Sequence, residues 1–136
     1  MTESSTPDPF PYPRDHVVGV FAHDEAVGHV RDALSQAGFA EESVAVLHGE
    51  EDADRLDVKG EAHGVAGQLI RALQQISDVE LNHLERHATL LRSGEYLVGV
   101  VIADAGDEKQ RAVDALRAAG GTFINFYHGN YVESFG

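Results

Sequence analysis

The chain has 136 residues, with 23 acidic side chains against 10 lysines and arginines, a formal net charge of −13 and no cysteine. This charge argues against direct binding of nucleic acid or of an anionic membrane, since both need basic side chains. The lack of cysteine excludes disulfides and thiolate metal sites. The length suits one domain, and no apolar run is long enough to cross a bilayer, so we expect a cytoplasmic protein without a signal peptide.

The first segment, residues 1–15, contains all four prolines. Alternating prolines favour an extended chain without internal hydrogen bonds, so we expect a flexible arm here. A single domain is expected over residues 16–136. Apolar runs bounded by turn residues predict its strands at His16–Ala22, Ser43–His48, Tyr96–Ala103, Thr122–Tyr127 and Tyr131–Phe135.

Helices are expected between these strands. Apolar residues at helical spacing predict them over about residues 24–37, 65–76, 77–92 and 107–120. Asp24 is placed to cap the first helix, and Gly38 is placed to end it in a Schellman motif. Six acidic residues between Gly49 and Gly64 are interpreted as a solvated loop.

Two parts of the chain resemble each other. VVGVF at 17–21 corresponds to LVGVV at 97–101, DAL at 32–34 to DAL at 114–116, and VLHG at 46–49 to FYHG at 126–129. Each half is then strand, helix, strand, which predicts a ferredoxin-like α+β sandwich. A helical pair over about residues 64–93 would be inserted between the halves. The alternative is a small doubly wound parallel sheet.

The two central strands are apolar on both faces, although a ferredoxin-like sheet has helices on one face only. The second face could be covered by the helical pair, by another subunit or by an apolar ligand. We favour a homodimer that joins the sheets face to face. Gly19 and Gly99 occupy equivalent places in the two strands, and they mark either tight helix packing, which we favour, or the floor of a site for a flat ligand.

The chain has eight histidines, and the best spaced pair is His83 and His87. Their i, i+4 spacing puts both rings on one face of a helix, and Glu80 lies one turn earlier, so the three could bind a divalent metal, or the histidines a haem. The helical wheel places this face away from Leu84 and Leu91. A structural or surface role for the pair is the favoured interpretation.

Several other polar residues are candidates for a small-molecule pocket. His48 and His128 each end the second strand of a repeat and precede a glycine, and Asn125 lies in an apolar strand, where it needs a hydrogen-bond partner if buried. The acidic stretch with its flanking histidines could hold a cation, but a solvated run of charges is favoured. The group consists of His48, Glu50, Glu51, Asp52, Asp54 and His63.

No known catalytic pattern is present: the chain lacks a GxSxG elbow, a P-loop and a GxGxxG turn after a strand. A single-domain enzyme would depend on His83, His87 or His128 as acid or base. We favour a protein without enzymatic activity.

Two stretches carry a resemblance to a known family. VVGVFAHDEAVGHVRDALSQAGF, and later ELNHLERHATLLRSGEYLVGVVIAD, are similar to the bacterial general-stress (heat-induced stress protein) domain family. The match covers about residues 16–47 and 79–120. The resemblance implies a small, stress-associated bacterial protein, and it supplies no catalytic residues to carry over.

Overall fold

The computed structural model describes residues 15–57, 64–75, 81–103, 106–128 and 131–135. The expected arm, except for Asp15, lies outside these residues. The elements in chain order are β1 (His16–Phe21), α1 (Asp24–Gln36), the short 3₁₀ helix η2 (Glu41–Ser43), β2 (Val44–His48), α2 (Gly49–Asp57), α3 (Gly64–Gln75), α4 (Leu81–Arg92), β3 (Tyr96–Val101), α5 (Asp107–Ala118), β4 (Thr122–His128) and β5 (Tyr131–Ser134).

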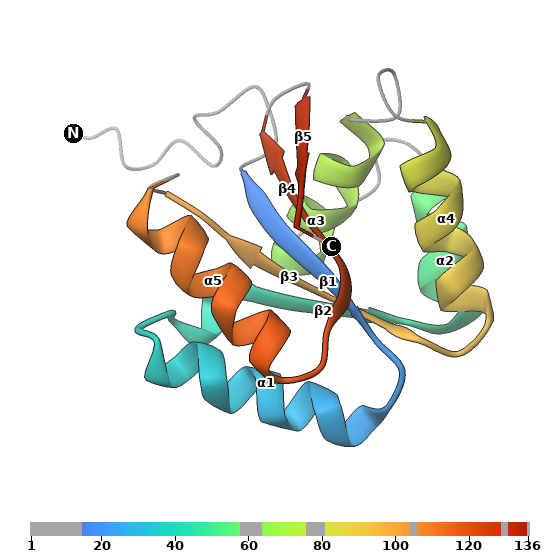
Figure 1. Ribbon diagram of the computed structural model, residues 1–136. Coiled ribbons are helices and arrows are strands. Elements are labelled where there is room, and N and C mark those ends of the chain that lie inside the picture. Colours follow the sequence, from blue (N-terminus) through green and yellow to red (C-terminus); the bar gives the residue numbers. More distant parts are fainter. Residues whose placement is uncertain (1–14, 58–63, 76–80, 104–105, 129–130, 136) are drawn as a thin grey trace.

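The described strands form one sheet in the order β2-β3-β1-β4-β5, and each neighbouring pair is antiparallel (Figure 1). The protein is therefore α+β, with a five-stranded antiparallel sheet and several helices. This architecture is compatible with the expected ferredoxin-like fold. The alternative of a doubly wound parallel sheet is wrong, because no pair of the described strands runs parallel.

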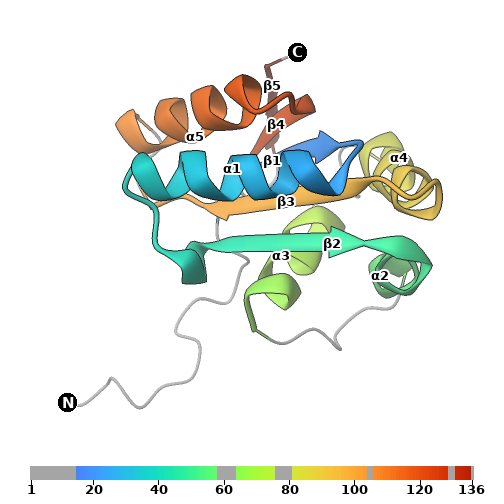
Figure 2. The ribbon, with the colours of Figure 1, turned by 90° about the horizontal axis from the view of Figure 1, so that it is seen from below.

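Helices cover both faces of the sheet. In Figure 2, α1 and α5 lie above it, and α2 and α3 lie below. On the first face, Leu34 of α1 and Leu116 of α5 join a core cluster with Val17, Val98 and Phe126. On the second face, the buried side chains of α2, α3 and α4 join Val18, Val20, Leu97 and Tyr127. The apolar second face is thus covered by this chain's own helices, the first of the three possible covers predicted from the sequence.

The acidic stretch was expected to be a loop, but residues Gly49–Asp57 form the helix α2. Its acidic side chains Glu50, Glu51 and Asp54 point to solvent, whereas Ala53 and Leu56 are fully buried in the second core cluster. Two apolar residues spaced three apart are enough to attach one face of a helix to the core. This apolar pair was not recognised in the sequence because most of the residues around it are acidic.

The ends of α1 test two predictions. Gly38 adopts φ = +97°, and the N–H groups of Gly38 and Phe39 donate to the carbonyls of Ser35 and Leu34. This is the predicted Schellman motif. The predicted cap at the start is wrong, because His23 is the N-cap residue without a side-chain hydrogen bond, and Asp24 is already in the first helical turn.

The free edge of β2 is short and partly closed. Alternate residues of this strand turn their backbone groups away from β3, namely Val44, Val46 and His48. The N–H of Val44 donates to the carbonyl of Glu41, and that of His48 donates to the Asp52 carboxylate at 2.9 Å. Of these three N–H groups, only that of Val46 has no hydrogen-bond partner among the described residues.

Candidate functional site

His87 of the predicted histidine pair is fully buried between α4 and the sheet. Its ring centroid lies 5.0 Å from that of Phe123 and 6.1 Å from that of Tyr127, both on β4. The helical wheel placed the His87 face of α4 away from the face of Leu91, and the leucine face was expected to be buried. In the structure both His87 and Leu91 are fully buried. Both sides of α4 are buried because the helix also packs against α2.

The expected metal or haem site fits this position poorly. A haem ligand must face a space wide enough for the porphyrin, so coordination by His87 would require α4 to move away from β4. No group of three histidine, aspartate or glutamate side chains in the described part of the chain is arranged to hold a metal ion. Glu80 and the side chain of His83 lie outside the described residues, so the set of Glu80, His83 and His87 stays a prediction.

Gly19 and Gly99 face opposite sides of the sheet. A Cβ atom on Gly19 would meet Ile124 and Leu116 of the first core cluster, whereas one on Gly99 would meet Leu69 of the second. The two glycines therefore cannot form one floor for a flat ligand. They also show that the strand alignment in the repeat was wrong, because equivalent residues of the two halves would lie on the same face.

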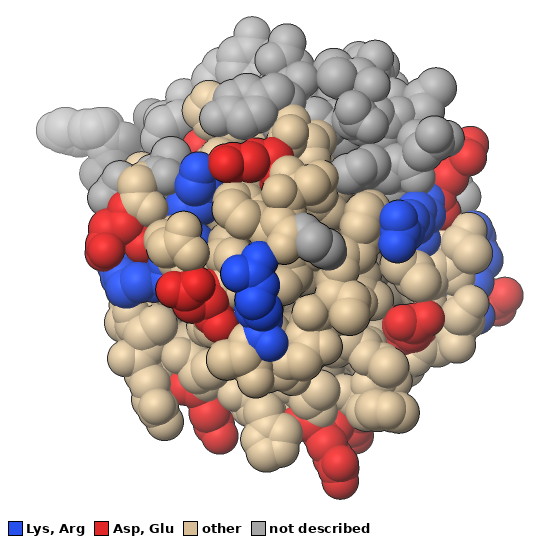
Figure 3. Space-filling model, viewed as in Figure 1, with Lys and Arg blue, Asp and Glu red and all other residues tan. Residues whose placement is uncertain are grey.

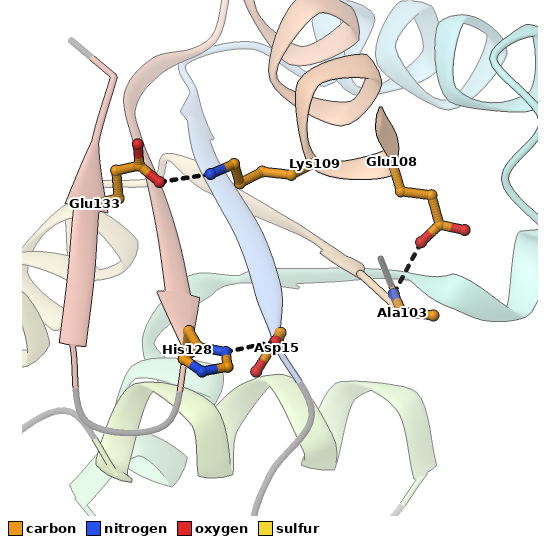
Figure 4. A network of polar contacts seen from close by, with 6 residues as sticks. All are labelled: Asp15, Ala103, Glu108, Lys109, His128 and Glu133. Atoms are coloured by element: carbon orange, nitrogen blue, oxygen red, sulfur yellow. Dashed lines mark hydrogen bonds and ion pairs between the residues drawn. The ribbon is translucent and has the colours of Figure 1, made fainter. Parts of the chain in front are cut away.

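His48 and His128 lie at opposite ends of the sheet. His48 pairs with Tyr96, which pairs with Phe21 at the end of β1, and its ring stacks on Tyr96 with centroids 4.0 Å apart. His128 follows Tyr127, which pairs with His16 at the start of β1. Nδ1 of His128 lies 2.7 Å from Oδ2 of Asp15, so the pair joins β4 to the start of β1 (Figure 4).

Asn125 is buried and hydrogen-bonded, as the sequence required. Its amide donates to the carbonyl of Phe123 at 3.1 Å, and its side-chain oxygen accepts from the Ser134 hydroxyl at 2.8 Å. Phe123 has φ = +48°, and the pairing of β1 with β4 shifts register beside it, between Val18 and Val20. Asn125 therefore supports an irregular stretch of β4, a structural role.

The acidic group around α2 does not converge on a cation site. Asp52 accepts the hydrogen bond from His48, Asp54 pairs with Arg92 at 3.0 Å, and Glu50 and Glu51 are exposed. His63 lies outside the described residues. The favoured interpretation of a solvated run of charges agrees with these positions.

A pocket on the surface beside α1 was not predicted from the sequence. It has a volume of about 360 Å³ and lies between α1, the turn after it and the start of β2. Its lining residues are Arg31, Asp32, Ser35, Phe39, Glu41 and Val44. No local sequence pattern indicated this pocket, because its lining residues come from three different elements. One signal was available: Arg31 is the sole lysine or arginine between His16 and Asp54.

Local structure explains how these side chains come together. Arg31 and Ser35 are four residues apart on α1, so they lie on the same side of the helix. The left-handed turn at Gly38 brings Phe39 back beneath α1, where it is only 8% exposed. The 3₁₀ turn then presents Glu41, and β2 begins at Val44. The pocket thus has an apolar floor and a polar rim.

The polar side chains of the rim are available to a ligand. Arg31, Asp32, Ser35 and Glu41 make no side-chain hydrogen bond or ion pair with any other described residue. The other lysines and arginines whose side chains the structure describes differ from Arg31 in this respect. They have partners within the fold: Asp54 for Arg92, Glu133 for Lys109 (Figure 4), Asp107 for Arg111, the carbonyl of Phe135 for Arg117, the ring of Phe123 for Arg86, and a further contact for Arg71.

Comparison with known proteins gave no matching family model, no matching curated protein and no matching solved structure. The resemblance to bacterial general-stress proteins therefore stays a prediction. Among the helices of the described part, none combines the length and the apolar composition needed to cross a membrane.

Proposed function

We propose that this protein is a small, homo-oligomeric module of bacterial stress physiology that works in the cytoplasm, binds a small molecule and has no enzymatic activity of its own. The pocket of Arg31, Asp32, Ser35, Phe39, Glu41 and Val44 is the observation that carries the proposal. A concave site with an apolar floor and a few polar groups is the usual form of a small-molecule site.

The chemistry of the rim supports binding over catalysis. A serine needs a neighbouring base to act as a nucleophile, and no histidine is among the described residues that line the pocket with Ser35. Guanidinium and carboxylate groups at neutral pH hold fixed charges, which orient a ligand. A rigid helix presents Arg31, Asp32 and Ser35, so little ordering is needed when a ligand binds.

We further infer that the fold is a duplicated strand–helix–strand unit with the helical pair inserted between the copies. Two observations support a duplication. The helices α1 and α5 pack on the same face of the sheet, and each ends at a glycine with positive φ, Gly38 at +97° and Gly120 at +94°. The three helices α2, α3 and α4 lie between β2 and β3 in the chain, where a ferredoxin-like fold needs only a turn.

We further propose that the protein self-associates through a surface other than the second face of the sheet. The face expected to form the dimer is covered by α2, α3 and α4, so a dimer must use another surface. Sedimentation equilibrium of the full chain tests this part. A mass of two or more chains at micromolar concentration is the expected result, and a monomer across the whole concentration range would contradict it.

A thermal-shift screen tests the binding function. Small carboxylates, amines, amino acids, sugars and nucleosides are added to the full-length protein, and a ligand of the folded state raises Tm in proportion to its occupancy. We expect at least one compound to raise Tm in the wild type but not in Arg31→Gln. Arg117→Gln, on the neighbouring helix α5, is the matched control and should keep the shift. If no compound raises Tm, the proposed binding function is wrong.

A further inference from the structure

The pocket rim carries charges of both signs within a short distance along the chain. Arg31 and Asp32 are consecutive on α1, and Glu41 lies across the pocket on the 3₁₀ turn. The rim therefore has one positive and two negative charges. On the face of the molecule drawn in Figure 3, acidic and basic side chains are likewise interspersed over the surface, without one large patch of a single sign.

Arg31 indicates that the ligand has an anionic group. The chain has only 10 lysines and arginines, and outside this pocket those whose side chains the structure describes have partners within the fold. An arginine in a pocket without an internal partner has all its donors available. A guanidinium matches the two oxygens of a carboxylate in a bidentate arrangement.

Asp32 and Glu41 indicate that the same ligand also has a cationic group. A ligand with only negative charge, such as a phosphate, would be attracted by Arg31 but repelled by two carboxylates. A ligand with only positive charge would be attracted by the carboxylates and repelled by the guanidinium. A zwitterion can place each of its charges beside one of the opposite sign.

Phe39 and Val44 limit the remainder of the ligand. Both belong to the first core cluster or pack against it, and together they form the apolar part of the pocket. A volume of about 360 Å³ is near the lower end of the range for small-molecule sites, roughly 300–1,000 Å³. The ligand must therefore be small, with a short apolar part.

We propose that the pocket binds an α-amino acid with an apolar side chain: Arg31 holds the carboxylate, Asp32 and Glu41 hold the ammonium group, and the side chain lies on Phe39 and Val44. This inference rests on the proposed function, because it assumes that the pocket is a ligand site. Ser35 adds a hydroxyl that can donate to the carboxylate.

Isothermal titration calorimetry with three matched probes tests the inference on the full-length protein. L-leucine carries both charges, 4-methylpentanoate lacks the ammonium group, and 3-methylbutylamine lacks the carboxylate. L-valine and L-phenylalanine extend the series in size. We expect an apolar amino acid to bind, and we expect the analogue that lacks either charge to bind about tenfold or more weakly, since each loses a charge-assisted hydrogen bond.

Two variants assign each charge to a side chain. Arg31→Gln should weaken binding of the amino acid about tenfold or more and strengthen that of 3-methylbutylamine, because the guanidinium holds the carboxylate of the amino acid and repels the ammonium group of the amine. Glu41→Gln should weaken binding of the amino acid and strengthen that of 4-methylpentanoate. Arg117→Gln should change none of these values. Circular dichroism melting curves of the variants verify that each one is folded.

The outcomes separate this inference from the proposed function. If 4-methylpentanoate or 3-methylbutylamine binds as tightly as leucine, or if Arg31→Gln binds leucine normally, the zwitterion inference is overturned while a ligand-binding function stands. If neither these probes nor any compound of the thermal-shift screen binds, the proposed function itself is overturned.

Discussion

Gly99 of β3 lies directly against Leu69 of α3, and a Cβ atom at position 99 would be 2.7 Å from both Leu69 methyl carbons. Leu69 is fully buried in the second core cluster, so it has little room to move. The absence of a side chain at Gly99 is therefore what allows α3 to approach the sheet closely.

We predict that Gly99→Ala lowers the free energy of unfolding by about 1–3 kcal/mol, since overpacking forces Leu69 or the backbone to shift. Urea unfolding followed by circular dichroism measures the change. Gly19→Ala is the control, because its Cβ would meet Ile124 and Leu116 at ordinary distances of 3.4 and 3.6 Å. Equal losses at the two positions would contradict the close approach of α3.

The buried side of α2 leads to a second prediction. Leu56 is 1% exposed, so Leu56→Ala should lower the free energy of unfolding by about 2–5 kcal/mol through lost burial and a new cavity. Glu51→Gln, on the exposed side of the same helix, should cost less than about 1 kcal/mol. If both variants unfold at the wild-type urea concentration, residues 49–57 behave as the solvated loop first expected from the sequence.

Asn125 should be sensitive to substitution despite its distance from the pocket. Asn125→Ala removes both hydrogen bonds of this buried side chain, the one to the carbonyl of Phe123 and the one from the Ser134 hydroxyl, so we expect a loss of about 1–3 kcal/mol in the free energy of unfolding. Ser134→Ala removes only one partner of Asn125 and should cost less. Thermal melts rank the two variants, and a smaller effect for Asn125→Ala than for Ser134→Ala would be the opposite of this expectation.

The buried position of His87 makes haem binding testable. When hemin is added to untagged protein, we expect the same absorbance spectrum for wild type and His87→Phe, because the ring of His87 is fully buried against β4. His83→Ala completes the comparison. A Soret band that is present in wild type and lost in His87→Phe would instead restore the haem alternative.

The secondary structure was largely predictable because local patterns determine it. Apolar runs between turn residues identified the five strands, and glycines after the apolar stripe identified where α1 and α5 end. The start of α1 was less predictable, since an aspartate in a first turn stabilises the helix through its dipole as readily as through a cap.

The face of the sheet on which each strand residue lies was harder to predict. Gly19 and Gly99 occupy matching places in VVGVF and LVGVV, but a shift of one residue moves a side chain to the other face of a sheet. The sequence similarity of two short apolar strands cannot resolve such a shift. The register, in which Gly19 pairs with Val98, resolves it.

The candidate site could not be predicted because its residues meet only in three dimensions. Arg31, Phe39 and Val44 come from a helix, a turn and a strand, and no local spacing connects them. The sequence instead indicated a metal or haem site at His83 and His87, since their i, i+4 spacing is typical of helical metal ligands. Burial of His87 depends on α4 having two packed sides, which the pattern of its leucines alone did not indicate.

The partly closed edge of β2 has a consequence for aggregation. A strand that offers a row of unpaired N–H groups is a template on which partly unfolded chains build aggregates. In β2, Glu41 and Asp52 already hold two of the three outward N–H groups, so a foreign strand would find a single donor at Val46. The β2 edge should therefore be a poor template for the addition of a further strand, so aggregates should not grow from this side of the sheet.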